Sequence, residues 1–141
     1  MATNPSDNNL HLWRSKAIDS FAQAEAAIDL LAQKLNAPAK IDMLGQKIEA
    51  LRKAKPNAAI SDERKSAIDK SLAELSALLG IRNDIVHSPM VIEKVGEGTV
   101  ATFANPNVQC AFSSFKRVLP APRLQALANK VASLARNLET A

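Results

Sequence analysis

Three residues that can act together on a phosphate ester lie within six positions of the sequence. Arg82 and Asn83 are adjacent, and His87 follows four residues after the asparagine. A histidine side chain exchanges a proton near neutral pH, an arginine stabilises the charge of a phosphate, and an amide can orient either group. We therefore interpret Arg82, Asn83 and His87 as candidate catalytic residues for metal-independent cleavage of RNA, in which the 2′-hydroxyl attacks its own phosphate.

The spacing of these residues predicts that they lie near the end of a helix. Asn83 and His87 share a helix face, whereas Arg82 and His87 are about 140° apart at roughly 100° per residue. Pro89 disfavours helical backbone at Ser88, so the helix is expected to end there with His87 near solvent. An apolar stripe at helical spacing precedes the motif and is formed by Ile68, Leu72, Leu75, Leu79 and Val86. The stripe predicts that Arg82 occupies the position of a core residue, where its long side chain either extends to solvent or is held by a compensating partner or anion.

A purely structural role is the alternative for the same three residues. An asparagine or histidine at a helix end can hydrogen-bond the last carbonyl groups of that helix. The spacing alone therefore leaves both a catalytic and a capping interpretation open.

The composition predicts one compact domain, residues 1–141. The chain is 47% hydrophobic and 23% charged, with a net charge of +4 that favours acidic partners, including nucleic acid. No apolar run reaches membrane-spanning length and the start is polar, so we expect a cytoplasmic protein without membrane contact.

The scarcity of cysteine and histidine narrows the chemistry further. Cys110 is the single cysteine, which excludes an intramolecular disulfide and is typical of a reducing compartment. Its thiol is interpreted as a buried structural group, with a nucleophile as the alternative. His11 and His87 are the two histidines, too few for a four-ligand zinc site, and we expect no metal or cofactor.

The patterning predicts a mainly all-α fold, an up-and-down four-helix bundle with a small β-hairpin insertion between helices 3 and 4. Residues 1–9 are expected to form a flexible arm. The helices are expected at about 13–35, 41–55, 61–87 and 120–138. The β insertion spans residues 90–118, with a hairpin of 90–95 and 99–103 around Gly96-Glu97-Gly98. Residues 108–118 are ambiguous and allow one more short strand.

An acidic pair and a basic face on the predicted helices are further candidates for functional residues. Glu25 and Asp29 are one turn apart and are interpreted either as a solvated face or as acid and base groups. The second helix carries Lys47, Arg52, Lys53 and Lys55 on its back. This basic face is interpreted as solubilising, with phosphate contact as the alternative.

The string Arg82-Asn83-Asp84-Ile85-Val86-His87, late in the third predicted helix, resembles the signature of the HEPN superfamily (higher eukaryotes and prokaryotes nucleotide-binding domains). That signature consists of an arginine, a polar residue directly after it, and a histidine near the helix end. The resemblance implies an all-α bundle that dimerises so that two copies of the motif meet in one cleft. It also implies that Arg82 stabilises the transition-state phosphate, Asn83 positions substrate or histidine, and His87 transfers the proton.

The resemblance carries expectations about partners as well. Many members of the family are metal-independent endoribonucleases of toxin–antitoxin, abortive-infection or CRISPR-linked systems, so RNA and an antitoxin or nucleotidyltransferase are the expected partners of a homodimer. Other members bind nucleotides or proteins without catalysis. A non-catalytic module that binds an anion, a nucleotide or a partner protein is therefore the alternative function.

Overall fold

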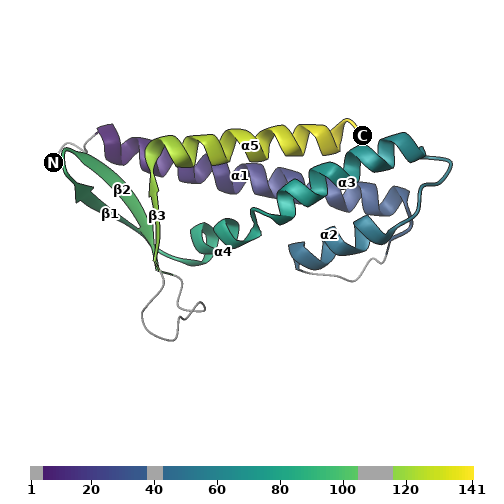
Figure 1. The fold of residues 1–141 in the computed structure, drawn as a ribbon, viewed down its shortest axis with the longest axis horizontal. Helices are drawn as coiled ribbons and strands as arrows, with labels where there is room; N and C mark the ends of the chain where they lie inside the picture. The colour runs from purple at the N-terminus through teal and green to yellow at the C-terminus, as the bar shows by residue number, and fades with distance from the viewer. Residues whose placement is uncertain (1–4, 38–42, 105–115) are drawn as a thin grey trace. The chain divides into compact units, whose positions relative to one another are not determined.

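A computed structural model describes residues 5–37, 43–104 and 116–141. These residues form a mainly helical fold with a small antiparallel sheet, as the sequence predicts (Figure 1). The elements in chain order are α1 (Pro5–Lys34), α2 (Leu44–Lys53), α3 (Asp62–Ser76), α4 (Leu79–His87), β1 (Met90–Val95), β2 (Gly98–Phe103), β3 (Arg117–Pro120) and α5 (Ala121–Glu139). Among the described residues, no helix has both the length and the apolar character of a membrane span.

The chain divides into two compact units. Unit 1 takes residues 1–19 and 80–130, and unit 2 takes residues 20–79 and 131–141. Helices α1 and α5 therefore each contribute one end to each unit. The single domain expected from the length stays a prediction.

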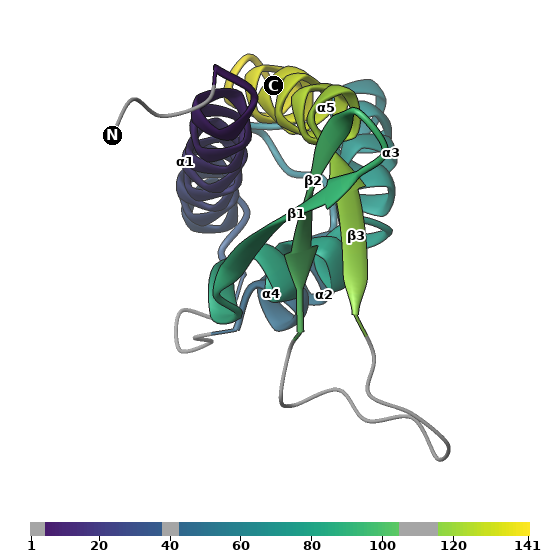
Figure 2. The same ribbon diagram turned by 90° about the vertical axis from the view of Figure 1, so that its left-hand side faces the viewer.

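The sheet belongs to unit 1 and has the strand order β1-β2-β3, with both pairs antiparallel (Figure 2). Strands β1 and β2 form the predicted hairpin, in which Val95 pairs with Gly98 across a two-residue turn. Gly96 opens that turn with φ of 62°, a left-handed conformation that glycine adopts without steric cost. The third strand begins at Arg117, close to the end of the ambiguous segment. Cys110 and most of that segment lie outside the described residues.

The two faces of the sheet differ in burial. Ala101, Phe103 and Leu119 lie on one face and are 7% exposed or less. On the opposite face Val91 and Val118 are about half exposed, whereas Thr102, which pairs with both of them, is 5% exposed. The buried face therefore supplies the strand contribution to the core of unit 1.

Helix α1 begins at Pro5, so the prediction of a flexible arm at residues 1–9 is wrong for residues 5–9. Leu10 already lies in the core and is fully buried. At the other end, Asn36 adopts φ of 54°, the left-handed conformation that commonly terminates helices. The predicted stop at Asn36-Ala37-Pro38 is thereby confirmed up to residue 37.

The third predicted helix is in fact two helices. Helix α3 ends at Ser76, and after two turn residues α4 begins at Leu79. The amide of Leu78 binds the carbonyl of Leu75 at 3.0 Å, a tighter i to i−3 bond than an α-helix makes. Gly80, a poor helix former, is the second residue of α4. Because the helix is interrupted, a stripe extrapolated from α3 is not a guide to the buried face of α4.

The burial of the α4 residues differs from the predicted core position of Arg82. Ile68, Leu72 and Leu75 are buried as expected. On α4, however, the buried residues are Asp84 and Ile85, while Arg82 is only half buried. The charged group in the core of this helix is therefore a carboxylate and not a guanidinium.

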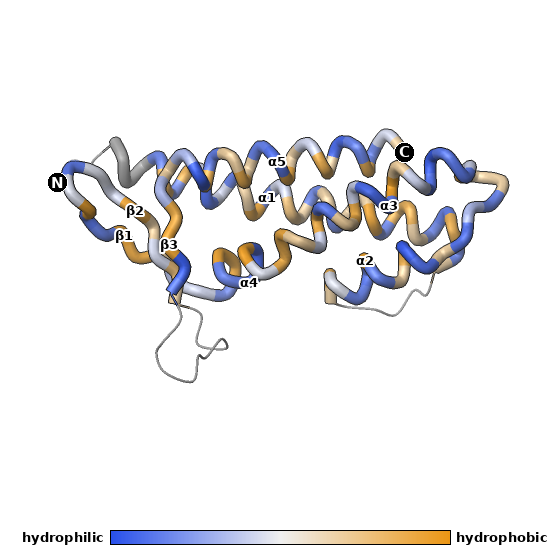
Figure 3. The backbone as a smooth tube through the Cα atoms, viewed as in Figure 1, coloured by the Kyte–Doolittle hydropathy of each residue, from blue (hydrophilic) through white to orange (hydrophobic). Residues whose placement is uncertain are grey.

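The remaining helices follow their predicted stripes. Ser61 caps α3 by accepting a hydrogen bond from the amide of Arg64 at 3.3 Å. Helix α5 alternates hydrophobic and hydrophilic residues along its length (Figure 3), and it buries Leu124, Leu127, Val131, Leu134 and Leu138. Helix α2 buries Leu44, Ile48 and Leu51, and the predicted stripe residue Ile41 lies outside the described residues.

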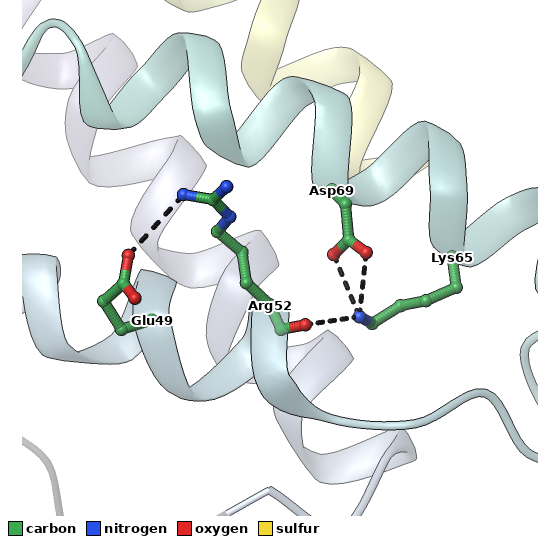
Figure 4. A network of polar contacts seen from close by, with 4 residues as sticks. All are labelled: Glu49, Arg52, Lys65 and Asp69. Atoms are coloured by element: carbon green, nitrogen blue, oxygen red, sulfur yellow. Dashed lines mark hydrogen bonds and ion pairs between the residues drawn. The ribbon is translucent and has the colours of Figure 1, made fainter.

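A buried lysine links α2 to α3 within unit 2 (Figure 4). Lys65 is 4% exposed, and its ammonium lies 2.9 and 3.1 Å from the two carboxylate oxygens of Asp69. The same ammonium donates to the main-chain carbonyl of Arg52 at 3.0 Å. Three acceptors thus compensate the loss of water around this charge.

We expect Lys65→Met to lower the free energy of unfolding by about 2 kcal/mol, because it removes hydrogen bonds made by a charged donor while keeping the apolar stem. Urea unfolding followed by circular dichroism measures the change. Lys70→Met, at an exposed position of the same helix, is the control and should stay within about 0.5 kcal/mol of wild type. Equal stability of both variants would contradict the assigned role of Lys65.

Candidate functional site on helix α4

The three motif side chains lie outside the most deeply buried face of α4. Asn83 and His87 are exposed, and Arg82 is half buried. Arg82 Nη1 donates to Asn83 Oδ1 at 3.2 Å, so the structure brings these two side chains together. Within the described part of the chain, no hydrogen bond joins His87 to either of them. The expected position of His87, near solvent in the last turn of its helix, is confirmed.

The opposite face of α4 is anchored by an ion pair that sequence reasoning missed. Asp84, 2% exposed, accepts a hydrogen bond from Arg117 Nε at 2.6 Å. A Cβ added at Gly80 would lie 3.8 Å from Arg117 Nη2, so the guanidinium lies along the helix from Gly80 to Asp84. A signal was present in the sequence, since Asp84 lies three residues after Ile81 and directly before Ile85, both apolar.

A second arginine binds the main chain at the end of α4. Arg14, on α1, donates from Nε and Nη2 to the carbonyl of Ile85 at 3.1 and 2.8 Å. Its Nη2 also donates to the carbonyl of Ser88 at 3.0 Å. The guanidinium carbon lies 5.7 Å from the centre of the Phe103 ring, within cation–π range. Arg14 therefore connects α1, the end of α4 and strand β2.

The acidic candidates Glu25 and Asp29 contact a lysine of α2 in unit 2. Lys47 Nζ lies 3.3 Å from Glu25 Oε1 and 3.1 Å from Asp29 Oδ1. Burial lowers the pKa of Lys47, but the hydrogen bonds and the attraction of both carboxylates raise it by more, so the pKa is above its ordinary value. The pairing differs from the solvated basic face predicted for Lys47 and gives both acids a structural partner.

A groove of about 770 Å³ lies in unit 2, beside the end of α1 and along α2. Its lining is mainly apolar and includes Leu35, Met43 and Ala50. The predicted motif does not line this groove. Within the described residues, no group of three or more histidine, cysteine, aspartate or glutamate side chains is placed to hold a metal ion.

We expect Arg117→Met to lower the free energy of unfolding by about 3 kcal/mol, because it removes a guanidinium that donates to the buried carboxylate of Asp84. Adding Asp84→Asn to that variant should restore part of the loss, since the amide carries no charge. Chemical denaturation of both single variants and the double variant gives the coupling energy. Arg123→Met, exposed at the start of α5, is the control. If the losses of unfolding free energy in the two single variants simply add up in the double variant, the pairing of Arg117 with Asp84 is refuted.

The raised pKa of Lys47 predicts a pH-dependent contribution to stability. A group whose pKa is higher in the folded state stabilises the fold below its unfolded value, near the ordinary 10.5, and this contribution disappears as pH rises through the folded value. We expect Lys47→Met to be less stable than wild type at pH 7 by at most about 1 kcal/mol. Unfolding titrations from neutral to strongly alkaline pH should show this difference shrinking, and a constant difference would contradict the assignment.

Comparison with protein-family models, with curated proteins and with solved structures finds no match to this chain.

Proposed function

We propose that this chain is a HEPN-like, metal-independent endoribonuclease. The observation that carries the proposal is the division of α4 into two faces. Asp84 and Ile85 hold the helix through its buried side, whereas Arg82, Asn83 and His87 are left to face a ligand. A motif that merely stabilised the helix end would be expected to supply the anchoring contacts itself.

The proposed reaction is transfer of the phosphodiester within the RNA. The bond between the 2′-oxygen and phosphorus forms, the bond to the 5′-oxygen breaks, and a cyclic phosphate remains on the upstream fragment. His87 transfers protons between the 2′-hydroxyl, the solvent and the leaving oxygen. Arg82 stabilises the charge that develops on the phosphate oxygens. Asn83, which accepts a hydrogen bond from Arg82, holds the guanidinium in place.

We further propose that the helices form a four-helix bundle and that two copies associate through the motif face. Val86 is half buried and lies between Arg82 and His87 around the helix, which gives this face an apolar centre with polar flanks. Two copies would bring two histidines to one substrate, so that one accepts a proton while the other donates. An antitoxin or nucleotidyltransferase is the proposed protein partner of such a toxin or defence component.

The angle between Arg82 and His87 favours a second candidate function. Five residues separate them by about 140° on a regular helix, which suits two separate contacts to one partner. The alternative is a module that binds an anion, a nucleotide or a protein through this face without catalysis. In that case the motif contributes to binding or association but not to RNA cleavage.

We expect the wild-type protein to cleave a mixed RNA substrate in the presence of EDTA and to leave 2′,3′-cyclic phosphate ends. His87→Ala and Arg82→Ala should each reduce cleavage by about 100-fold or more, because each removes a group that acts in the transition state. Gel electrophoresis of end-labelled RNA measures the rate and the product ends. His11→Ala is the matched control, since it removes the other histidine, which is exposed on α1.

Circular dichroism and light scattering establish that each variant keeps its fold and oligomeric state. Folded variants that cleave like wild type would overturn the assigned roles. Loss of association or ligand binding in these variants, without any RNA cleavage by wild type, would instead support the binding module.

A further inference from the structure

At the C-terminal end of α4, one backbone carbonyl has no hydrogen-bond donor within its own helix. In a continuing helix the carbonyl of Ile85 accepts from the amide four residues later. That residue is Pro89, which has no amide hydrogen. The last bond of this type joins the amide of Ser88 to the carbonyl of Asp84 at 3.1 Å. The next carbonyl belongs to Ile85, which is fully buried, so water does not readily replace the missing donor.

Arg14 supplies the missing donors from a different helix. Its guanidinium gives two N–H groups to the Ile85 carbonyl and a further bond to the Ser88 carbonyl, at 2.8 to 3.1 Å. The charge also suits the negative end of the helix dipole. Arg14 follows Leu10 by four residues and precedes Ala17 by three, and both of these are fully buried. The arginine is therefore held on the core-facing stripe of α1, above the buried ring of Phe103.

The two carbonyls that Arg14 binds flank His87 in the chain. One guanidinium thus fixes the backbone on both sides of the proposed proton-transfer residue, whose side chain is exposed. We propose that Arg14 is a positioning residue that holds His87 in its productive orientation. The proposal rests on the proposed ribonuclease function, and it adds a residue outside the motif, about 70 positions earlier in the chain, to the catalytic arrangement.

The test compares Arg14→Met with Lys16→Met, a control that removes an exposed cation from the same helix. For Arg14→Met we expect kcat for RNA cleavage to fall about 10- to 100-fold with KM nearly unchanged, because a misplaced histidine weakens the transition state more than substrate binding. Hydrogen exchange of the amides at 86–88 should accelerate by about tenfold or more, because the turn loses its clamp. Wild-type kcat and exchange in Arg14→Met would overturn the proposal.

Replacement of the proline tests the physical cause. Pro89→Ala restores an amide hydrogen four residues after Ile85, so the loss of kcat caused by Arg14→Met should be smaller in the Pro89→Ala background. Arg14→Lys keeps the charge without the planar fork and should recover only part of kcat. An equal loss of kcat in both backgrounds would show that Arg14 does not act through this carbonyl.

RNA cleavage by the wild-type protein separates the two possible failures. If wild-type protein leaves RNA intact, the proposed function fails, and the catalytic role of Arg14 fails with it. If wild-type protein cleaves RNA and Arg14→Met changes neither kcat nor exchange, the positioning role alone fails. A fall in kcat of Arg14→Met with a matched fall in the folded fraction, measured by circular dichroism, also counts against positioning.

Discussion

The C-terminal turn of α4 depends on donors from outside its own helix. Pro89 removes the amide that would bind the carbonyl of Ile85, and Arg14 replaces it with two guanidinium hydrogens. Arg117 holds the same turn from another side through Asp84. Arg14 therefore fixes the backbone at the end of α4, and Arg117 fixes the buried face of the same helix. The side chains of Asn83 and His87 are exposed.

The buried charged side chains Lys65 and Asp84 are each compensated by hydrogen-bond partners at short distance. Lys65 has a carboxylate and a carbonyl within hydrogen-bond distance, and Asp84 has the guanidinium of Arg117. Such pairs regain little more than their desolvation cost, but a shifted arrangement would leave a charge buried alone. The buried charged pairs therefore add little to the free energy of unfolding. Their main effect is to disfavour alternative packings of the helices. In α4 this selects the rotation of the helix that buries Asp84 and leaves His87 exposed.

The local elements were largely predictable because their signals are local. The stripe of α5, the cap at Ser61 and the glycine turn of the hairpin each depend on residues within a few positions of one another. The error at Arg82 has a physical reason. A helical stripe extrapolates only while the helix is continuous, and this helix is interrupted by a turn between Ser76 and Leu79. The prediction of a flexible arm failed for residues 5–9 because their polar composition is typical of unfolded segments. In the structure these residues belong to α1, which buries Leu10.

By itself the sequence determined the mainly helical class, the hairpin, the end of α4 before Pro89 and the exposed position of His87, because proline geometry and apolar periodicity act over a few residues. Only the tertiary structure decided that Asp84 is buried against Arg117 and that Arg14 binds the carbonyls beside His87. Those partners lie 33 and about 70 positions away, and no local pattern specifies which distant arginine completes a helix end. The choice is made when the chain folds, because a buried carbonyl or carboxylate must find a donor.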